Sequence, residues 1–487
     1  MRRGVRASAA LLAVLLAAPA SAQTAAGVKP DRSKPPALGP VRALKLPPIQ
    51  KLRLGNGLPV LLVESHEVPV VQVNVVVRAG AGADPVGKPG LASLAADMLD
   101  EGAGSASALQ ISDEVDFLGA ELEAVAGWDA TRVGLHVPVK RLERALAILA
   151  DVVQRPTFPA AELDRLRKER LTELLQARDE PSAIASVALA RALYGKDHRY
   201  GTITMGTDAS VRRFSRDDLT SFHGRAFRPN NAAVVVVGDV TAAGIQPLLE
   251  KAFGGWKAEG TFASSVPAAP QVSNREIWIV DRPDSAQSEI RIGRIGPPRS
   301  TADYYPLLVT NTILGGSFTS RLMQNLREQH GYAYGARSSF DYRLSTGPFV
   351  AAAAVQTDKT GPSLTEFFKE LDAIGKTVTE AEVTKAKNYV ALSFPSEVET
   401  TGDLAAKLQE QFVYGLADGW LDQFVSRVQA VTLADVRRVA SQYIEPGKVA
   451  VVVVGDRKKI EAEVKALNLG PVKVLSVDEV FGGTARR

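Results

Sequence analysis

The 487-residue chain contains no cysteine, so no disulfide can form within it. Histidine is also scarce. No two histidines are four positions apart, the spacing that lets two imidazoles on one helix face bind the same metal ion. Each is therefore interpreted as structural or exposed. The five histidines are His66, His136, His198, His223 and His330.

After residue 22 the chain carries almost no net charge. The formal net charge of the whole chain is +4. Three arginines, Arg2, Arg3 and Arg6, lie before residue 23, where there is no acidic residue, so the remainder carries +1. A nearly balanced charge gives no argument for nucleic acid as a partner.

The N-terminal apolar stretch, Ala7 to Ala18, is too short to span a bilayer. It follows a basic start and precedes the small residues Ala20-Ser21-Ala22, the pattern of a cleavable secretory signal. We expect cleavage near Ala22, no stable membrane anchor, and a periplasmic or secreted mature protein. Without disulfides, its stability has to come from hydrophobic cores.

An internal repeat organises the rest of the chain. Residues 214–239 and 431–456 align without a gap, at an offset of 217 residues, and agree at 9 of 26 positions. Each copy begins with a Ser/Thr-x-x-Asp helix start and ends in Val-Val-Val-Val-Gly-Asp, which predicts a helix followed by a buried strand. The repeat indicates a duplicated domain.

The fold class expected from these patterns is α+β, with two homologous domains that each pack helices on an antiparallel-rich sheet. Strand patterns occur at 52–64, 68–78, 276–280, 288–295, 337–344 and 347–356. Helical patterns occur at 89–101, 106–118, 139–154, 160–177, 184–194, 304–314, 320–330, 363–374, 380–393 and 401–414. The expected organisation is a signal peptide at 1–22, an extended Pro-rich arm at 23–48, a first domain at 49–258, a linker at 259–273, a second domain at 274–470 and a tail at 471–487.

The helix expected at 89–101 opens with Gly90-Leu91-Ala92, follows two strands, and precedes a long helical region that carries Glu173. This series of elements ends with the strand Val-Val-Val-Val-Gly-Asp. In this order of elements, the chain from roughly 50 to 470 resembles the insulinase/pitrilysin family of zinc metallopeptidases. The resemblance is to the small bacterial two-domain type, and it implies that the two domains together form a clamshell.

Active members of that family carry His-x-x-Glu-His on this helix, with a more distal glutamate as the third zinc ligand. The resemblance places Ser93, Ala96 and Asp97 at the three motif positions and Glu173 at the distal one. A methyl group cannot accept a proton, and a hydroxyl is a poor neutral ligand for zinc. We therefore expect no catalytic residue and no bound cofactor in this chain. Asp97 and Glu173 remain residual metal candidates, with solvated surface charges as the alternative interpretation.

The segment at 315–334 in the second half matches another part of the family pattern. In the family, an arginine and a tyrosine seven residues apart in the non-zinc domain hydrogen-bond the substrate backbone. Arg327 and Tyr334 match this pair, and Gly331 is suited to end the intervening helix. Tyr332 is the competing tyrosine. An arginine in a surface ion pair and a tyrosine packed in the sheet are the alternative interpretations.

The expected function is that of a zinc-free subunit which holds peptide substrate, through Arg327 and Tyr334, for a homologous partner subunit with an intact zinc motif. The expected partners are thus that subunit, in a heterodimer, and a peptide or unfolded protein. One alternative is a non-hydrolytic peptide-binding or chaperone-like protein that captures an extended segment by strand addition. Another is an autonomous peptidase that uses Asp97 and Glu173 with a further ligand.

Overall fold

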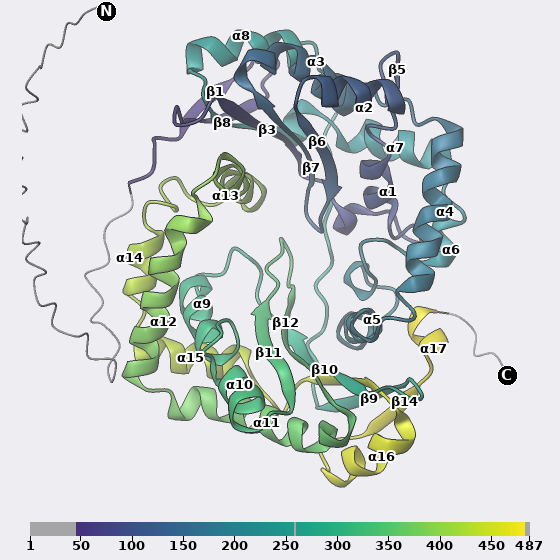
Figure 1. Cartoon of the computed structure of the whole chain (residues 1–487), viewed down its shortest axis with the longest axis vertical. Coiled ribbons are helices and arrows are strands. Elements are labelled where there is room, and N and C mark those ends of the chain that lie inside the picture. The colour runs from purple at the N-terminus through teal and green to yellow at the C-terminus, as the bar shows by residue number, and fades with distance from the viewer. Residues whose placement is uncertain (1–44, 258–259, 483–487) are drawn as a thin grey trace, which may run out of the picture. The chain divides into compact units, whose positions relative to one another are not determined.

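The computed structural model describes residues 45–257 and 260–482. The expected signal peptide with its cleavage site, most of the expected Pro-rich arm, and the last five residues lie outside this range. The described part contains two six-stranded mixed sheets with helices packed on them (Figure 1). The expected α+β fold with two similar halves is confirmed.

The first half builds a sheet in the order β1-β2-β8-β3-β7-β6, in which β2 and β8 are parallel and the other neighbours antiparallel. Its sheet strands are β1 (Gln50–Arg53), β2 (Pro59–Glu64), β3 (Val70–Val77), β6 (Glu121–Ala126), β7 (Thr131–Pro138) and β8 (Ala232–Gly238). Two short strands, β4 (Gly102–Ala103) and β5 (Ala106–Ser107), pair separately. Its helices are α1 (Leu91–Asp97), α2 (Ala108–Phe117), α3 (Leu142–Gln154), α4 (Ala160–Gln176), α5 (Pro181–Tyr194), α6 (Asp208–Val211), α7 (Arg216–Ala226) and α8 (Ala242–Phe253).

The second half repeats this plan in the order β11-β12-β10-β13-β9-β14. Its strands are β9 (Glu276–Asp281), β10 (Gln287–Ile295), β11 (Ala333–Phe340), β12 (Pro348–Gln356), β13 (Ala450–Gly455) and β14 (Val472–Leu475). Its helices are α9 (Tyr304–Leu314), α10 (Arg321–Met323), α11 (Thr360–Thr377), α12 (Glu380–Ser393), α13 (Thr401–Tyr414), α14 (Phe424–Gln429), α15 (Leu433–Tyr443), α16 (Arg457–Ala466) and α17 (Val477–Phe481). In the described ranges, none of the helices has the length and apolarity that crossing a bilayer requires.

The sequence repeat forms the same unit in both halves. Helices α7 and α15 start at capping boxes on Ser215 and Thr432, where the side chain and the third helical residue bond each other's backbone N–H groups. Each helix leads into a fully buried strand, β8 or β13, with one parallel and one antiparallel neighbour. The duplicated segment therefore supplies an inner strand of each sheet.

Several elements were not predicted from the sequence. The pair β6 and β7 was missed. The residues of β6 (Glu-Leu-Glu-Ala-Val-Ala) alternate between exposed and partly buried, whereas β7 is largely buried. The helices α8 and α16 were missed as well, and the stretch expected as a tail contains β14 and α17. The helix expected at 320–330 is α10 continued by a π-helix at Gln324–Gln329.

Each half packs one helix against the sheet of the other. Helix α5 of the first half lies on β10 and β13, and helix α13 of the second half lies on β3 and β8. One apolar cluster accordingly joins Val235 and Val237 to Leu408 and Val413, all nearly inaccessible to solvent. Burial of this apolar surface stabilises the contact between the halves.

Asp84 fixes the start of α1 and gives a pH-dependent prediction. Its two carboxylate oxygens accept the backbone N–H groups of Gly90 and Ala92, each at 2.7 Å. Burial raises the pKa of Asp84 from 3.8 to about 7. Because this folded-state pKa lies above the unfolded one, the stability that Asp84 contributes falls as pH rises from about 4 to 7. We expect the stability advantage of the wild type over Asp84→Asn to shrink across this range, as measured by urea unfolding.

The control for that experiment is Asp113→Asn, at an exposed position of α2. Its stability relative to the wild type is expected to stay constant between pH 4 and 8. A wild-type advantage over Asp84→Asn that grew with pH would contradict the assignment.

Candidate functional site

The first candidate site is the exposed face of helix α1. The helix begins after Gly90, whose φ of 92° places it in the left-handed region that glycine adopts without strain. Ser93 and Asp97, four positions apart, share one partly exposed face. Ala96 is only 1% exposed. At the position where the resemblance expects a glutamate there is thus a buried methyl group.

A buried arginine connects the motif positions to the distal glutamate. Arg170, on α4, is 7% exposed and forms an ion pair with Asp97 through Nη2. Its Nη1 donates to Ser93 Oγ at 3.2 Å, and its Nε lies 3.3 Å from Glu173 Oε2, one turn along the same helix. One guanidinium therefore contacts all three residues that the resemblance places at the zinc-ligand positions.

The charges at this site are unevenly compensated. Burial raises the pKa of Asp97 to about 6, with the Arg170 guanidinium opposing that rise and the carboxylates of Glu173 and Asp100 adding to it. The Glu173 side chain is 55% exposed and largely solvated. Arg170 therefore supplies the positive charge on which ionised Asp97 depends.

These donors do not fit a catalytic zinc ion. Such a site needs about three protein ligands, usually with imidazole, and an open position for water. Here the ligand positions offer one hydroxyl and two carboxylates, and a guanidinium already contacts them. Within residues 45–257 and 260–482, no three His, Cys, Asp or Glu side chains are arranged to hold a metal ion.

The histidines do not gather at this face. His66 pairs with Asp239 at 2.7 Å, and His136 lies 3.2 Å from Gln72. His198 and His223 contact backbone carbonyl oxygens, of Pro267 and Val153 respectively, and His330 stacks on Tyr332.

The second candidate site, around Arg327 and Tyr334, is marked by two backbone irregularities. Arg327 lies in the π-helix, in which the N–H of His330 bonds the carbonyl of Asn325 at 3.1 Å. Tyr334 lies in a β-bulge, because the pairing of β11 with β12 shifts between Ala333 and Ala336. Such π-helical turns and bulges are costly, and they concentrate at functional sites, where they redirect side chains.

The two irregularities bring three side chains together. The Arg327 guanidinium lies 4.8 Å from the ring centre of Phe318 and 5.0 Å from that of Tyr334. Phe318 is 58% exposed and Tyr334 is 86% exposed. The guanidinium thus lies beside two exposed rings at the surface, and its Nε also lies 3.3 Å from Glu328 Oε1, which is the surface ion pair of the alternative interpretation.

Tyr332 differs from Tyr334 in its surroundings. Its ring stacks on His330 with a centroid distance of 4.9 Å, and its backbone carbonyl accepts the N–H of Gln356. Its side chain is partly buried against the core. Of the two tyrosines, the one seven residues after Arg327 is therefore the freely accessible one. Gly331 ends the helix with a φ of 64°, as expected.

Strand β6 forms the outer edge of the first sheet and lies against α1. Its residues alternate between exposed and half-buried, with Glu121, Glu123 and Val125 on the exposed side. An edge strand offers unpaired backbone N–H and C=O groups to another extended chain. This edge therefore provides a place where a peptide can add as a strand beside α1.

Two residues of these sites were not singled out from the sequence. Arg170 is three positions before Glu173, so the two side chains lie on the same face of α4. This spacing could have indicated a cation near Glu173. Phe318 belongs to the same segment as Arg327, but nothing in its spacing indicated a contact with the arginine. The described residues contain no hydrogen bond or ion pair that joins the two sites.

Comparisons with known families agree with the two-domain fold. The family model described as insulinase (peptidase family M16) matches residues 59–208, and the model described as peptidase M16 inactive domain matches residues 213–390. The two matches follow one another along the chain and include strands of both sheets, but not β1, β13 or β14.

The relatives found are bacterial proteins of similar length. An uncharacterized zinc protease of Mycobacterium leprae is 27% identical over 395 residues, covering 80% of this chain and 88% of that protein. An uncharacterized zinc protease of Bacillus subtilis is 24% identical over 397 residues, covering 81% and 95%.

Solved structures show the same architecture. The crystal structure of a peptidase M16 inactive domain from Pseudomonas fluorescens has a TM-score of 0.79 at 25% identity, covering 84% of this chain and 98% of that chain. A protease from Helicobacter pylori has a TM-score of 0.78 at 22% identity, covering 84% and 100%, which supports the fold alone.

Proposed function

Because this chain belongs to the insulinase family of peptidases (family M16), we propose that it is a zinc-free subunit which holds peptide substrate for a catalytic partner. The partner is a homologous subunit with an intact His-x-x-Glu-His motif, and the zinc ion belongs to that subunit. The pair cuts peptides or unfolded protein segments. With its expected export signal, the chain works in the periplasm or outside the cell.

The observation that carries this proposal is the position of Arg170. Its guanidinium contacts Ser93, Asp97 and Glu173, the residues that the resemblance places at the family's metal-ligand positions. A zinc ion there would meet the positive charge at close range, and no imidazole replaces the lost donors. Ala96 also leaves no carboxylate to take a proton from water.

The substrate-holding role rests on Arg327, Phe318 and Tyr334. A guanidinium offers five N–H donors and a phenol one O–H donor, which suits the carbonyl oxygens of a peptide backbone. The two exposed rings hold the guanidinium in one place, so less conformational freedom is lost on binding. In the assembled pair, these donors stabilise negative charge that develops on the substrate carbonyl.

A second candidate function is peptide capture without hydrolysis. The open edge of β6 beside α1 favours it, because backbone pairing along that edge binds extended segments whatever their sequence. In that case the chain binds unfolded polypeptide by itself, and no partner is needed.

Reconstitution distinguishes the two functions. The chain is purified from its native host in a tagged form, and any associated homologue is identified by mass spectrometry. The two proteins are then produced separately and mixed in an assay with an unstructured fluorogenic peptide. Hydrolysis that requires both chains, is abolished by chelation and returns with zinc supports the proposal. Stable peptide binding by this chain alone, with no hydrolysis in any mixture, supports the second function.

We predict that the isolated chain hydrolyses no peptide, whether or not zinc is added. The physical reason is the missing general base at Ala96 and the guanidinium among the ligand positions. The measurement is peptide turnover by this chain alone, with equilibrium dialysis against zinc as a second readout. Zinc-dependent hydrolysis by the purified monomer, with one zinc bound per chain, would overturn the proposal.

A further inference from the structure

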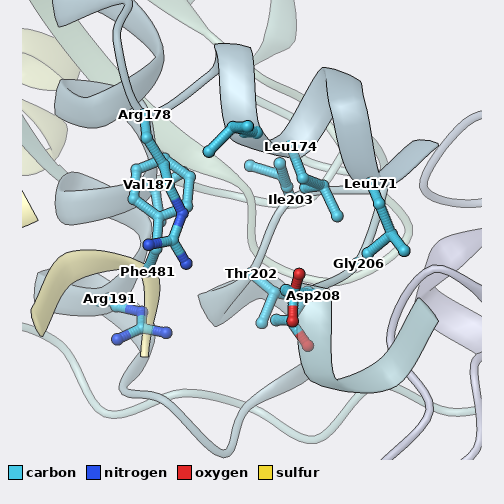
Figure 2. A pocket seen from close by; sticks show the side chains of 12 residues that line it. Leu171, Leu174, Arg178, Val187, Arg191, Thr202, Ile203, Gly206, Asp208 and Phe481 are labelled. Atoms are coloured by element: carbon cyan, nitrogen blue, oxygen red, sulfur yellow. The ribbon is translucent and has the colours of Figure 1, made fainter. Parts of the chain in front are cut away.

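A pocket of about 220 Å³ lies where the C-terminal helix α17 meets helices α4 and α5 (Figure 2). Its remaining wall is the segment Thr202–Asp208, which leads into α6. Pockets for drug-sized ligands hold about 300–1,000 Å³, so this pocket suits a smaller molecule. It lies beside the face of α1, because Met205, next to the pocket residue Gly206, accepts a hydrogen bond from Arg170 at 3.4 Å.

One side of the pocket is aliphatic. Leu171 and Leu174 of α4 and Ile203 lie together on this side (Figure 2). Leu174 and Val187 are 3% and 5% exposed, so they form a firm wall rather than mobile surface groups. A hydrocarbon body of a few carbons would be buried favourably against them.

The other side carries two arginines. Arg178 pairs with Asp478 at 2.9 Å, and its guanidinium lies 5.3 Å from the ring centre of Phe481. Arg191 donates through Nη1 to the carbonyl oxygen of Glu479 at 2.9 Å. Both arginines therefore also hold α17 in place (Figure 2).

The charge of Arg191 lacks a compensating anion. Its Nε is buried without a hydrogen-bond partner, and among the described residues no carboxylate forms an ion pair with it. Burial lowers the pKa of Arg191, which reflects the cost of a desolvated charge. A half-buried cation with a buried, unused donor favours an anionic ligand.

Asp208, the acidic residue of the pocket wall, does not neutralise this charge. Both of its oxygens accept hydrogen bonds from Arg212, each at 2.8 Å, outside the pocket lining. The hydrogen bond from Arg212 lowers the pKa of Asp208, so the carboxylate is ionised and already paired. The pocket therefore presents a net positive side and an aliphatic side.

We propose that this pocket binds a small aliphatic carboxylate, with the carboxylate at Arg191 and the hydrocarbon on Leu171, Leu174 and Val187. Two sources share this chemistry: a free fatty acid of medium length, and the C-terminal aliphatic residue of a peptide. The ligand would contact α4, α5 and α17 at once, and so would tie the C-terminal helix to the first half. The proposal is independent of the peptidase role.

Calorimetric titration of the purified chain at pH 8 tests the site with three probes: octanoate, N-acetyl-leucine and octan-1-ol. At least one of the two carboxylates is expected to bind at one molecule per chain. Octan-1-ol, which has no charge, is expected to bind at least about tenfold more weakly than octanoate if octanoate binds. Preference for N-acetyl-leucine identifies a peptide C-terminus as the source, and preference for octanoate identifies a fatty acid.

Arg191→Gln is expected to weaken binding of the preferred carboxylate by about tenfold or more. Arg155→Gln is the matched control, since Arg155 is 66% exposed on its side chain and pairs with Asp151 at the surface. The control should bind like the wild type.

A second pair of variants does not depend on changing Arg191, which also contacts α17. Leu175 lines the pocket but is 62% exposed, so its replacement leaves the core intact. Leu175→Glu should weaken carboxylate binding severalfold through repulsion, and Leu175→Lys should not weaken it. The proposal is wrong if neither carboxylate binds the wild type, or if Arg191→Gln, correctly folded by circular dichroism, keeps the wild-type affinity. It is also wrong if Leu175→Glu and Leu175→Lys bind equally well.

Discussion

Replacing Arg327 with alanine is expected to lower kcat/KM of the reconstituted peptidase by about 100-fold, the usual effect of removing one donor that stabilises negative charge. The guanidinium lies 4.8 and 5.0 Å from the ring centres of Phe318 and Tyr334, and alanine removes both its charge and its donors. The measurement is steady-state hydrolysis of a fluorogenic peptide by equimolar chains. The amount of complex, measured by gel filtration, should not change.

The control for Arg327 is Arg337→Ala. Arg337 is an exposed arginine on the same strand as Tyr334 and lies outside the aromatic pair. Arg327→Lys should fall between the wild type and Arg327→Ala, because lysine keeps the charge but lacks the planar fork. Tyr334→Phe removes only the phenol donor and should cost about tenfold. Equal activity of the Arg327→Ala and Arg337→Ala complexes would refute a substrate-holding role for this site.

Replacing Arg170 with leucine is expected to lower the free energy of unfolding by about 3 kcal/mol near pH 8. Arg170 is 7% exposed, and its removal leaves Asp97 as a partly buried carboxylate without its cation. This value is the lower end of the loss of stability usually caused by breaking a buried ion pair, because the Asp97 side chain is 34% exposed and so only partly buried. The measurement is equilibrium unfolding in urea.

The double variant Arg170→Leu with Asp97→Leu separates loss of the charge partner from loss of packing. Removing both charges should restore most of the stability, since two apolar side chains then replace an ion pair. A double variant as unstable as Arg170→Leu would show that the arginine acts through packing alone.

The stability loss in Arg170→Leu should also depend on pH. In the wild type, burial raises the pKa of Asp97 to about 6 against the pull of Arg170, so without the arginine the pKa rises further. A carboxyl group whose pKa is higher in the folded state does not destabilise the fold while it is protonated. Its ionisation lowers the free energy of unfolding as pH rises from the pKa of the unfolded state to the pKa of the folded state. The variant should therefore approach wild-type stability near pH 5 and fall below it progressively towards pH 8.

Elements with strong local signals were predicted accurately. Helices α9, α12 and α13 have the bounds expected from the sequence. For α12 and α13 the reason is local, because capping boxes at Thr379 and Thr400 fix their starts. The π-helix at 324–329 was predicted only as helix, because a change from i+4 to i+5 hydrogen bonds leaves little trace in side-chain periodicity.

Elements that depend on distant partners were missed. Strand β6 has no fully buried residue, and β7 pairs with it along its length. The short C-terminal helix α17 starts at a capping box on Ser476, a local signal that was missed, and it also contacts α5, Arg178 and Arg191. Tertiary contacts add to the stability of both elements.

The sequence by itself determined the donor atoms at positions 93, 96 and 97, because they follow directly from the residue types. It also determined the duplication, since the repeated segment needs no structure to be seen. Only the tertiary structure decided what these side chains contact: Arg170 reaches Asp97 from 73 positions away on another helix. Likewise, only the fold set Arg327 between two exposed rings. Contacts between distant segments depend on packing and desolvation, which no local pattern encodes.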